Sequence, residues 1–191
     1  MGFRDFEKST NEIVLKPLQN SSTNLEISAN DSGIAVSTKD YVSGYAYSKY
    51  YCDHLEYTMM YSGTAIFYDT NGNEIVKIEC TDSFSFMHGK WTLTCKVTML
   101  GEVVYDNSVD TTSIEEKYVT IKIYFDLANK QWVFERAGVT KRSKVTEWQP
   151  TYFSVSPRMW FIISQYDSMF FDGFIRITYM NKAVGYPQAV T

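Results

Sequence analysis

The sequence predicts an all-β protein in which two antiparallel sheets pack face to face. Three observations support this fold class. Short segments rich in β-branched and aromatic residues follow one another from residue 33 onward, and turn residues bound most of them. Only one short segment has the character of a helix. Aromatic residues make up 16% of the chain, with 15 Tyr and 12 Phe, and their side chains suit pleated, half-buried surfaces.

The first 30 residues differ from the rest because they are mostly polar. Clusters of turn-forming residues at 19–24 and 28–33 interrupt them. A segment of this composition buries too little apolar surface to offset the entropy lost on ordering it. We therefore expect a polar N-terminal arm at residues 1–30 that docks on a neighbouring molecule, and a β-sandwich domain at residues 31–191.

The stretch "FYDTNGNEIVKIEC", from Phe67 to Cys80, combines features of a calcium loop and of a β-hairpin. An EF-hand loop that began at Asp69 would need glycine at its sixth position and glutamate at its twelfth, but Glu74 and Cys80 stand there. The flanking segments have the composition of strands. Asn71 and Gly72 favour a type I′ turn, in which both central residues have positive φ. The sequence therefore predicts a hairpin tip and no calcium site.

A second hairpin is predicted around residues 117–136. In "KYVTIKIYFD", one face of the strand carries apolar residues at every second position, and the other face carries Thr120, Lys122 and Tyr124. The polar segment "DLANKQW" then returns the chain into "QWVFER". The helix candidate, "DTTSIEEKY" at residues 110–118, lies just before this hairpin.

The number of strands favours a jelly roll of the lectin and glucanase type over a seven-stranded immunoglobulin domain. The closing stretch "MWFIISQYDSMFFDGFIRITYM", residues 159–180, resembles the last strands of concanavalin A-like and laminin G-like sandwiches. This resemblance implies a two-sheet antiparallel β-sandwich. In composition, the Tyr- and Asn-rich chain also resembles capsid decoration and head-fibre proteins of tailed phages.

Charge and cysteine content exclude several kinds of partner and site. The net charge of −4 and the pI near 5.2 give no reason to expect nucleic acid as a partner. No apolar run is long enough for a membrane span or a signal peptide, so we expect synthesis in a host cytoplasm. Cys52, Cys80 and Cys95 lack the spacing of a zinc site and are odd in number, which argues against a disulfide framework.

The sequence contains no pattern of residues that indicates catalysis. It lacks the Glu-x-Asp-x-Glu array of sandwich glycosidases, the nucleophile elbow and the phosphate-binding glycine loops. A carboxylate pair from two different strands, for example Glu56 with Glu147, is an open alternative. We therefore expect no catalytic, metal or cofactor site and no cofactor, and we interpret the chain as a non-enzymatic protein.

Tyrosines concentrate in the stretch from residue 40 to residue 61. In an unbroken strand, residues with odd numbers share a face. The tyrosines that meet this condition are Tyr41, Tyr45, Tyr47, Tyr57 and Tyr61. Two interpretations of this face stay open, since tyrosine is intermediate in burial and enriched at interfaces: it is either core or a surface for a ligand or partner.

These expectations lead to two hypotheses for the function. The first is a structural protein of a phage virion, in capsid decoration or a fibre, whose partners are other protein subunits in a homo-oligomer or on a capsid. The alternative is a carbohydrate-binding, lectin-like module whose partner is a glycan and whose tyrosines stack on sugar rings. The position of the tyrosines distinguishes the two hypotheses: a concave exposed row favours a sugar.

Overall fold

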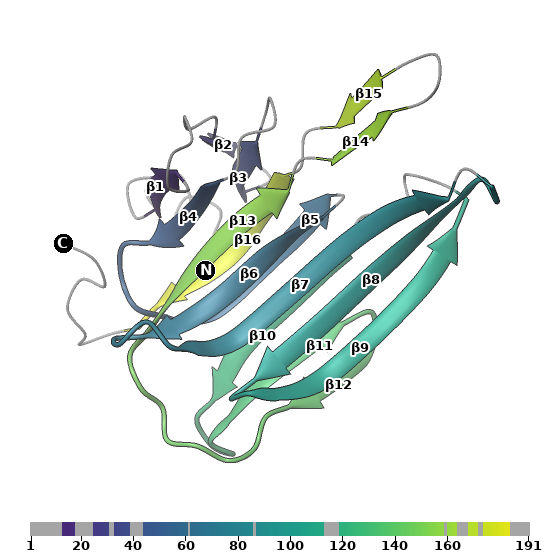
Figure 1. Ribbon diagram of the computed structural model, residues 1–191. Coiled ribbons are helices and arrows are strands. Elements are labelled where there is room, and N and C mark those ends of the chain that lie inside the picture. Colours follow the sequence, from purple (N-terminus) through teal and green to yellow (C-terminus); the bar gives the residue numbers. More distant parts are fainter. Residues whose placement is uncertain are drawn as a thin grey trace.

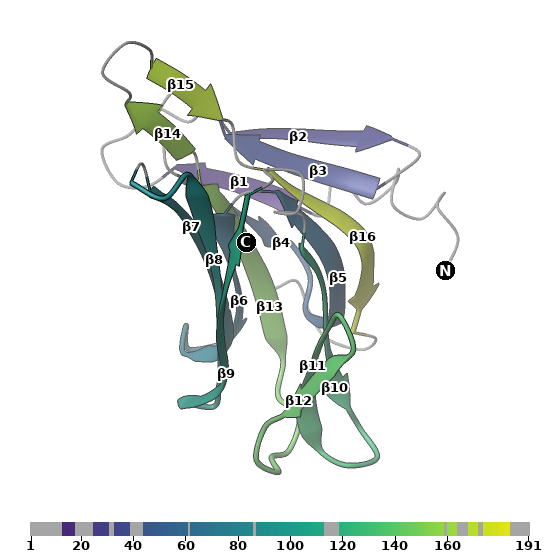
Figure 2. The same ribbon diagram turned by 90° about the vertical axis from the view of Figure 1, so that its right-hand side faces the viewer.

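The computed structural model describes residues 13–17, 25–30, 33–38, 44–60, 62–85, 87–112, 119–158, 160–163, 168–171 and 174–183. Within these ranges the protein is an all-β jelly-roll sandwich of two seven-stranded sheets, and every strand pairing is antiparallel (Figures 1 and 2). The described residues include no helix with the length and hydropathy that a membrane span requires. The predicted fold class is therefore confirmed.

One sheet, here called sheet A, lies in front in Figure 1. In spatial order its strands are β1 (Ile13–Pro17), β4 (Gly44–Ser48), β13 (Thr151–Arg158), β6 (Ser62–Asp69), β7 (Glu74–Ser85), β8 (Lys90–Met99) and β9 (Glu102–Thr111). Strands β6 to β9 are consecutive in the chain and form a meander, whereas β13 joins them from a distant part of the sequence.

The other sheet, sheet B, packs behind sheet A. In spatial order its strands are β12 (Val139–Arg142), β11 (Gln131–Arg136), β10 (Val119–Asp126), β5 (Cys52–Met60), β16 (Phe174–Lys182), β3 (Gly33–Thr38) and β2 (Leu25–Asn30). A separate hairpin of β14 (Trp160–Ile163) and β15 (Ser168–Phe171) projects beyond one end of the sandwich (Figure 2).

The core lies between the two sheets, and the side chains at every second position of the strands point into it. Phe67 of sheet A contacts Trp132 of sheet B with ring centroids 5.0 Å apart, and Phe153 lies beside it at 6.2 Å. The predicted alternation in β10 is confirmed, because Ile121 and Ile123 are fully buried. Burial of each such side chain stabilises the fold by about 1.5–3 kcal/mol, so these aromatic contacts hold the two sheets together.

The hairpin between β6 and β7 forms where the sequence predicts it, but its turn differs from the prediction. Gly72 has a φ of 82°, whereas Asn71 is not among the residues with positive φ. The Gly72 amide donates a hydrogen bond to the carbonyl oxygen of Asp69 over 3.1 Å. This is a three-residue loop, a type I turn followed by a left-handed glycine, and the type I′ prediction is wrong. The Asp69 carboxylate favours this form by accepting hydrogen bonds from the loop.

Three further predicted segments can be located at least in part. The hairpin predicted at residues 117–136 is confirmed as β10 and β11. Of the helix candidate at 110–118, residues 110 and 111 belong to β9, and residues 113–118 lie outside the described residues. Within residues 1–30, predicted as an arm, β1 pairs with β4 and β2 pairs with β3, so each forms an edge of one sheet.

Candidate functional site

Four tyrosines gather on the outer face of sheet A, the side that faces the viewer in Figure 1. They are Tyr45 and Tyr47 on β4, Tyr152 on β13 and Tyr68 on β6. Their inward neighbours Ala46, Phe153 and Phe67 are buried in the core. Because side chains alternate along a strand, the tyrosines on either side of these core residues must point outward. We call these four residues the tyrosine row.

The rings of the tyrosine row form a continuous series of contacts. Tyr68 and Tyr152 are directly opposite each other on β6 and β13, and their rings stack at 5.4 Å with an interplanar angle of 26°. Tyr152 meets the edge of Tyr47 at 6.4 Å, and Tyr47 lies 5.9 Å from Tyr45. Only 8% of Tyr47 is exposed, while the other three are half-buried. Each ring thus restricts the next, and the row presents a largely fixed aromatic surface.

Two hydroxyl groups of this row, those of Tyr68 and Tyr152, have a raised pKa and stay protonated over a wide pH range. Burial raises the pKa of the Tyr68 phenol, and the nearby Glu74 carboxylate adds to the effect, although a hydrogen bond with Ser154 acts in the opposite direction. Burial also raises the pKa of Tyr152, with the Tyr68 phenol as the next cause. Neutral phenol groups both donate and accept hydrogen bonds, so these two residues combine an apolar face with a polar edge.

Polar side chains cover the rest of this face, on β7, β8 and β9. Lys77 pairs with Glu79 at 3.1 Å on β7. Thr92 donates a hydrogen bond to Asp110 over 2.8 Å, and the hydroxyls of Thr94 and Ser108 are 3.1 Å apart. We call the outward residues of these three strands the polar ladder. It continues the surface of the tyrosine row with hydroxyl, carboxylate and ammonium groups.

The strands of sheet A curve, and the outer face of the sheet lies on the concave side of this curve. Figure 2 shows the strands nearly edge-on, and the loops at both ends of β7 and β8 turn away from sheet B. Strongly twisted and coiled strands curve in this way when one face packs on a core. The tyrosine row and the polar ladder therefore line a curved surface.

The structure separates the tyrosines that the sequence grouped on one face. Tyr45 and Tyr47 lie in the tyrosine row, but Tyr57 is fully buried between the sheets. Tyr45 and Tyr47 share a face, but the prediction that Tyr57 shares it is wrong, because β4 ends at Ser48 in sheet A and β5 begins at Cys52 in sheet B. Tyr41 and Tyr61 lie outside the described residues.

Sequence reasoning missed Tyr68 and Tyr152. The available signal was local: each tyrosine stands next to a phenylalanine, in "IFYD" and "TYFS". In a strand such a pair points to opposite faces. Neither segment, however, shows that β13 lies beside β6.

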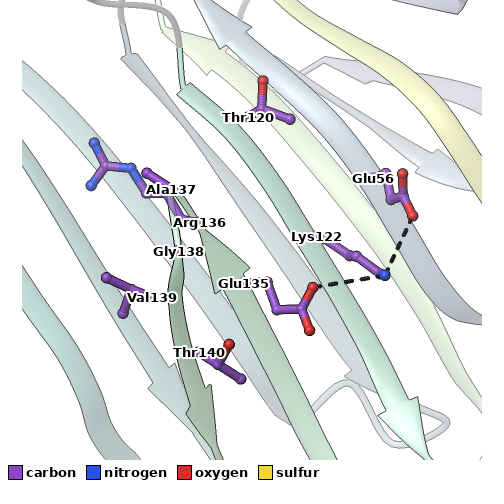
Figure 3. A pocket seen from close by; sticks show the side chains of 9 residues that line it. All are labelled: Glu56, Thr120, Lys122, Glu135, Arg136, Ala137, Gly138, Val139 and Thr140. Atoms are coloured by element: carbon purple, nitrogen blue, oxygen red, sulfur yellow. Dashed lines mark ion pairs between the residues drawn. The ribbon is translucent and has the colours of Figure 1, made fainter.

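The outer face of sheet B carries a different arrangement, shown in Figure 3. Lys122 on β10 lies between two carboxylates, 4.0 Å from Glu56 on β5 and 3.7 Å from Glu135 on β11. His54 hydrogen-bonds Glu56 at 2.9 Å, and the Tyr124 hydroxyl donates to Glu135 over 3.2 Å. The Lys122 side chain fills the space between the carboxylates, where the scissile bond of a glycoside would have to lie.

The open alternative of a Glu56 and Glu147 pair does not form. Glu147 pairs with Lys130 beyond the end of β12, while Glu56 belongs to the group around Lys122. Among the residues that the structure describes, no three side chains of His, Cys, Asp or Glu come together as a metal site.

No protein-family model matches the sequence, and no curated protein matches it either. Solved structures do resemble the fold. An alginate lyase from Alteromonas sp. 272 has a TM-score of 0.49 at 9% identity, covering 92% of this chain and 97% of its own. A β-glucanase from Bacillus licheniformis has a TM-score of 0.40 at 12% identity, with coverages of 89% and 99%.

A third similar structure is the κ-carrageenase from Pseudoalteromonas carrageenovora, in complex with an oligotetrasaccharide of κ-carrageenan. Its TM-score is 0.38 at 9% identity, covering 88% of this chain and 87% of its own. With identities and TM-scores this low, the likeness concerns the fold alone.

These comparisons correct the expectation of a non-enzymatic virion component. The similar structures named above are polysaccharide-degrading enzymes rather than capsid or fibre proteins. The same finding corrects the expectation that the chain is not an enzyme. The resemblance to phage proteins and the expected protein assembly have no support in these comparisons.

Proposed function

We propose that this protein binds a glycan chain on the outer face of sheet A, as a carbohydrate-binding, lectin-like domain. The observation that carries the proposal is the tyrosine row, which spans β4, β13 and β6 and borders the polar ladder on the concave side of the curved sheet. Ligand sites commonly combine aromatic walls with a few polar groups that fix orientation.

The chemistry of a sugar ring matches both halves of this face. The C–H groups on one side of a pyranose ring form an apolar patch that stacks on an aromatic ring, and its hydroxyls need polar partners at the edge. Stacked Tyr68 and Tyr152 provide the ring surface, and their hydroxyls lie at its rim. Because the rings contact one another before a ligand arrives, binding costs little side-chain entropy.

The size of the face fits an oligosaccharide rather than a single sugar. Neighbouring strands are about 4.8 Å apart, so the strands from β4 to β9 span roughly 24 Å across sheet A. An oligosaccharide that lies across the strands would contact the aromatic rings at one end and the polar ladder at the other. This crossing direction follows from the tyrosine row, because its members lie on neighbouring strands.

The charge of the polar ladder favours uncharged glycans over polyuronates. Its described carboxylates outnumber its lysines: Glu74, Glu79, Asp106 and Asp110 against Lys77, Lys90 and Lys96. Lys77 is already paired with Glu79, and Lys96 stands directly opposite both Glu79 and Asp106. Among the described residues of the polar ladder, no surplus positive charge is left to neutralise the carboxylates of an acidic polysaccharide.

Affinity electrophoresis in gels that contain one polysaccharide each tests the proposal. We expect a neutral β-glucan to retard the protein more strongly than alginate. Tyr68→Ala and Tyr152→Ala should each weaken retardation about tenfold or more, since this corresponds to about 1.4 kcal/mol of lost stacking. Tyr124→Ala is the matched control, because it removes an outward tyrosine from sheet B.

Two outcomes would contradict the proposal. One is that no polysaccharide retards the wild-type protein, and the other is that Tyr124→Ala weakens binding as much as Tyr68→Ala. The appearance of new reducing ends in the same polysaccharides would further show whether a bound chain is cleaved.

A further inference from the structure

Cys80 and Cys95 lie directly opposite each other on the antiparallel strands β7 and β8. Both side chains point into the core, with 5% and 2% of their surfaces exposed, and both are free thiols. Opposed residues on antiparallel strands have Cα atoms about 4.5 or 5.5 Å apart. A disulfide accepts Cα separations of about 4.4–6.8 Å. The backbone therefore already meets the main geometric requirement for a bond between these two residues.

The two thiols also influence each other's pKa. The neighbouring Cys95 thiol is the main cause of the raised pKa of Cys80, and the Cys80 thiol is the main cause of the lowered pKa of Cys95. Arg136 on β11 adds to the lowering at Cys95 through its charge and a hydrogen bond, against the effects of burial and of Asp106. The buried Tyr57 hydroxyl lies close enough for both cysteines to raise its pKa further, after burial itself. Cys95 is thus the better nucleophile and Cys80 the proton donor.

Arg136 connects this buried pair with the surface. Its side chain is half-exposed, lines the pocket of Figure 3 and reaches the Tyr105 hydroxyl at 3.5 Å. The same guanidinium group lowers the pKa of Cys95. A protein or glutathione is too large to reach sulfurs this deeply buried, so the oxidant has to be as small as hydrogen peroxide.

We propose that Cys80 and Cys95 are a peroxide-oxidised site that forms a disulfide across β7 and β8. The Cys95 thiolate attacks one oxygen of hydrogen peroxide, which gives a sulfenic acid at Cys95 and, after protonation, one water. The Cys80 sulfur then attacks the Cys95 sulfur, the S–S bond forms, and the hydroxyl leaves as a second water with the Cys80 proton. Two thiols lose two electrons in total, and one peroxide is reduced to two waters.

The bond would lie directly beneath the polar ladder. Glu79 and Lys96, the neighbours of the two cysteines in sequence, point outward on that ladder and are opposite each other. Oxidation would therefore fix the spacing of β7 and β8 at the surface where we place the glycan, without touching the tyrosine row. The inference itself does not depend on glycan binding.

Cys52 provides the internal control. It lies at the start of β5 in sheet B, and its thiol hydrogen-bonds the carbonyl oxygen of Tyr50 at 3.5 Å. Cys52→Ser should therefore leave oxidation of the pair unchanged. Cys80→Ser should stop the reaction at the sulfenic acid of Cys95, which dimedone traps.

The test treats the folded full-length chain with hydrogen peroxide, blocks the remaining thiols after unfolding, and maps peptides by mass spectrometry. We expect a Cys80–Cys95 peptide lighter by two hydrogen atoms, at equal yield in the wild type and in Cys52→Ser. The wild-type map alone decides the matter if a variant fails to fold. A disulfide that includes Cys52, a link between two chains, or both thiols still reduced in peroxide-treated wild type would each overturn the proposal.

Discussion

At the scale of single residues, two aspartates hold the two predicted hairpins in the same way. Asp69 Oδ1 accepts hydrogen bonds from the amides of Asn71 and Asn73, both at 2.8 Å. Asp126 Oδ1 accepts one from the Asn129 amide at 3.1 Å, and its Oδ2 accepts from the Asn129 side chain at 2.7 Å. The loop's own donors thus occupy the oxygens that a calcium ion would need at Asp69.

These carboxylates make stability depend on pH in acid. Hydrogen bonds from Asn129 and then Arg142 lower the pKa of Asp126 to about 2, and the Asn73 side chain is the main cause of the lowered pKa of Asp69. The folded-state pKa therefore lies below the unfolded value of about 3.9. Their contribution to stability is complete above the unfolded pKa and is lost as pH falls through the folded pKa.

We expect Asp126→Asn to destabilise the protein at pH 6 and to have a much smaller effect at pH 2. Urea denaturation of wild type and variant at a series of pH values measures this, and the two midpoints should converge between pH 5 and pH 2. Asn129→Ala, which removes the donor and keeps the carboxylate, should behave in the same direction. A difference between wild type and Asp126→Asn that stays constant over this range would refute the explanation.

At the scale of secondary-structure elements, the sequence predicted what is local. The alternation of Ile121, Ile123 and Phe125 and the turn residues after Asp69 and Asp126 require only a few neighbouring residues to be recognised. The shared face of Tyr45 and Tyr57 required the strand to be unbroken. The chain instead leaves sheet A at Ser48 and enters sheet B at Cys52, and no local period reveals that change.

The pairing of β3 with β16 depends on one glycine. Gly33, at the start of β3, has a φ of 120°, and a Cβ there would lie 2.3 Å from the carbonyl oxygen of Ile177. Gly33→Ala therefore forces backbone to move in addition to straining φ. We expect a loss of about 2 kcal/mol or more in the free energy of unfolding, since strain at such a φ alone costs about 1–3 kcal/mol.

Gly138→Ala is the matched control for this substitution. Gly138 has a φ of 80°, but nothing lies within 4 Å of its would-be Cβ. We expect Gly138→Ala to lower the free energy of unfolding by about 1 kcal/mol, which is the cost of the strained φ without a clash. Thermal unfolding of both variants measures the difference. Equal losses of stability would show that the close Ile177 carbonyl oxygen is not the reason why position 33 requires glycine.

At the scale of the whole molecule, the site arises from pairings between distant parts of the chain. Tyr68 meets Tyr152 only because β13 returns beside β6, and Glu56 meets Lys122 and Glu135 only because β10 lies between β5 and β11. Strand order of this kind depends on how two sheets share one core. For this reason the sequence predicted the fold class, whereas the tyrosine row became visible only in the structure.

The same shared core should make both sheets unfold together. Phe67 of sheet A is buried against Trp132 of sheet B and Phe153 of its own sheet. Phe67→Ala leaves a cavity between the sheets, and we expect a loss of about 3–5 kcal/mol in the free energy of unfolding. Leu127→Ala, at a side chain that is 72% exposed, should change it by less than about 0.5 kcal/mol.

Far-ultraviolet circular dichroism, which follows the strands, and near-ultraviolet circular dichroism, which follows the packed aromatic rings, should give one coincident transition in every variant. Separate transitions in Phe67→Ala would mean that each sheet is stable without the other, and that the aromatic contacts between them are not what holds the sandwich together.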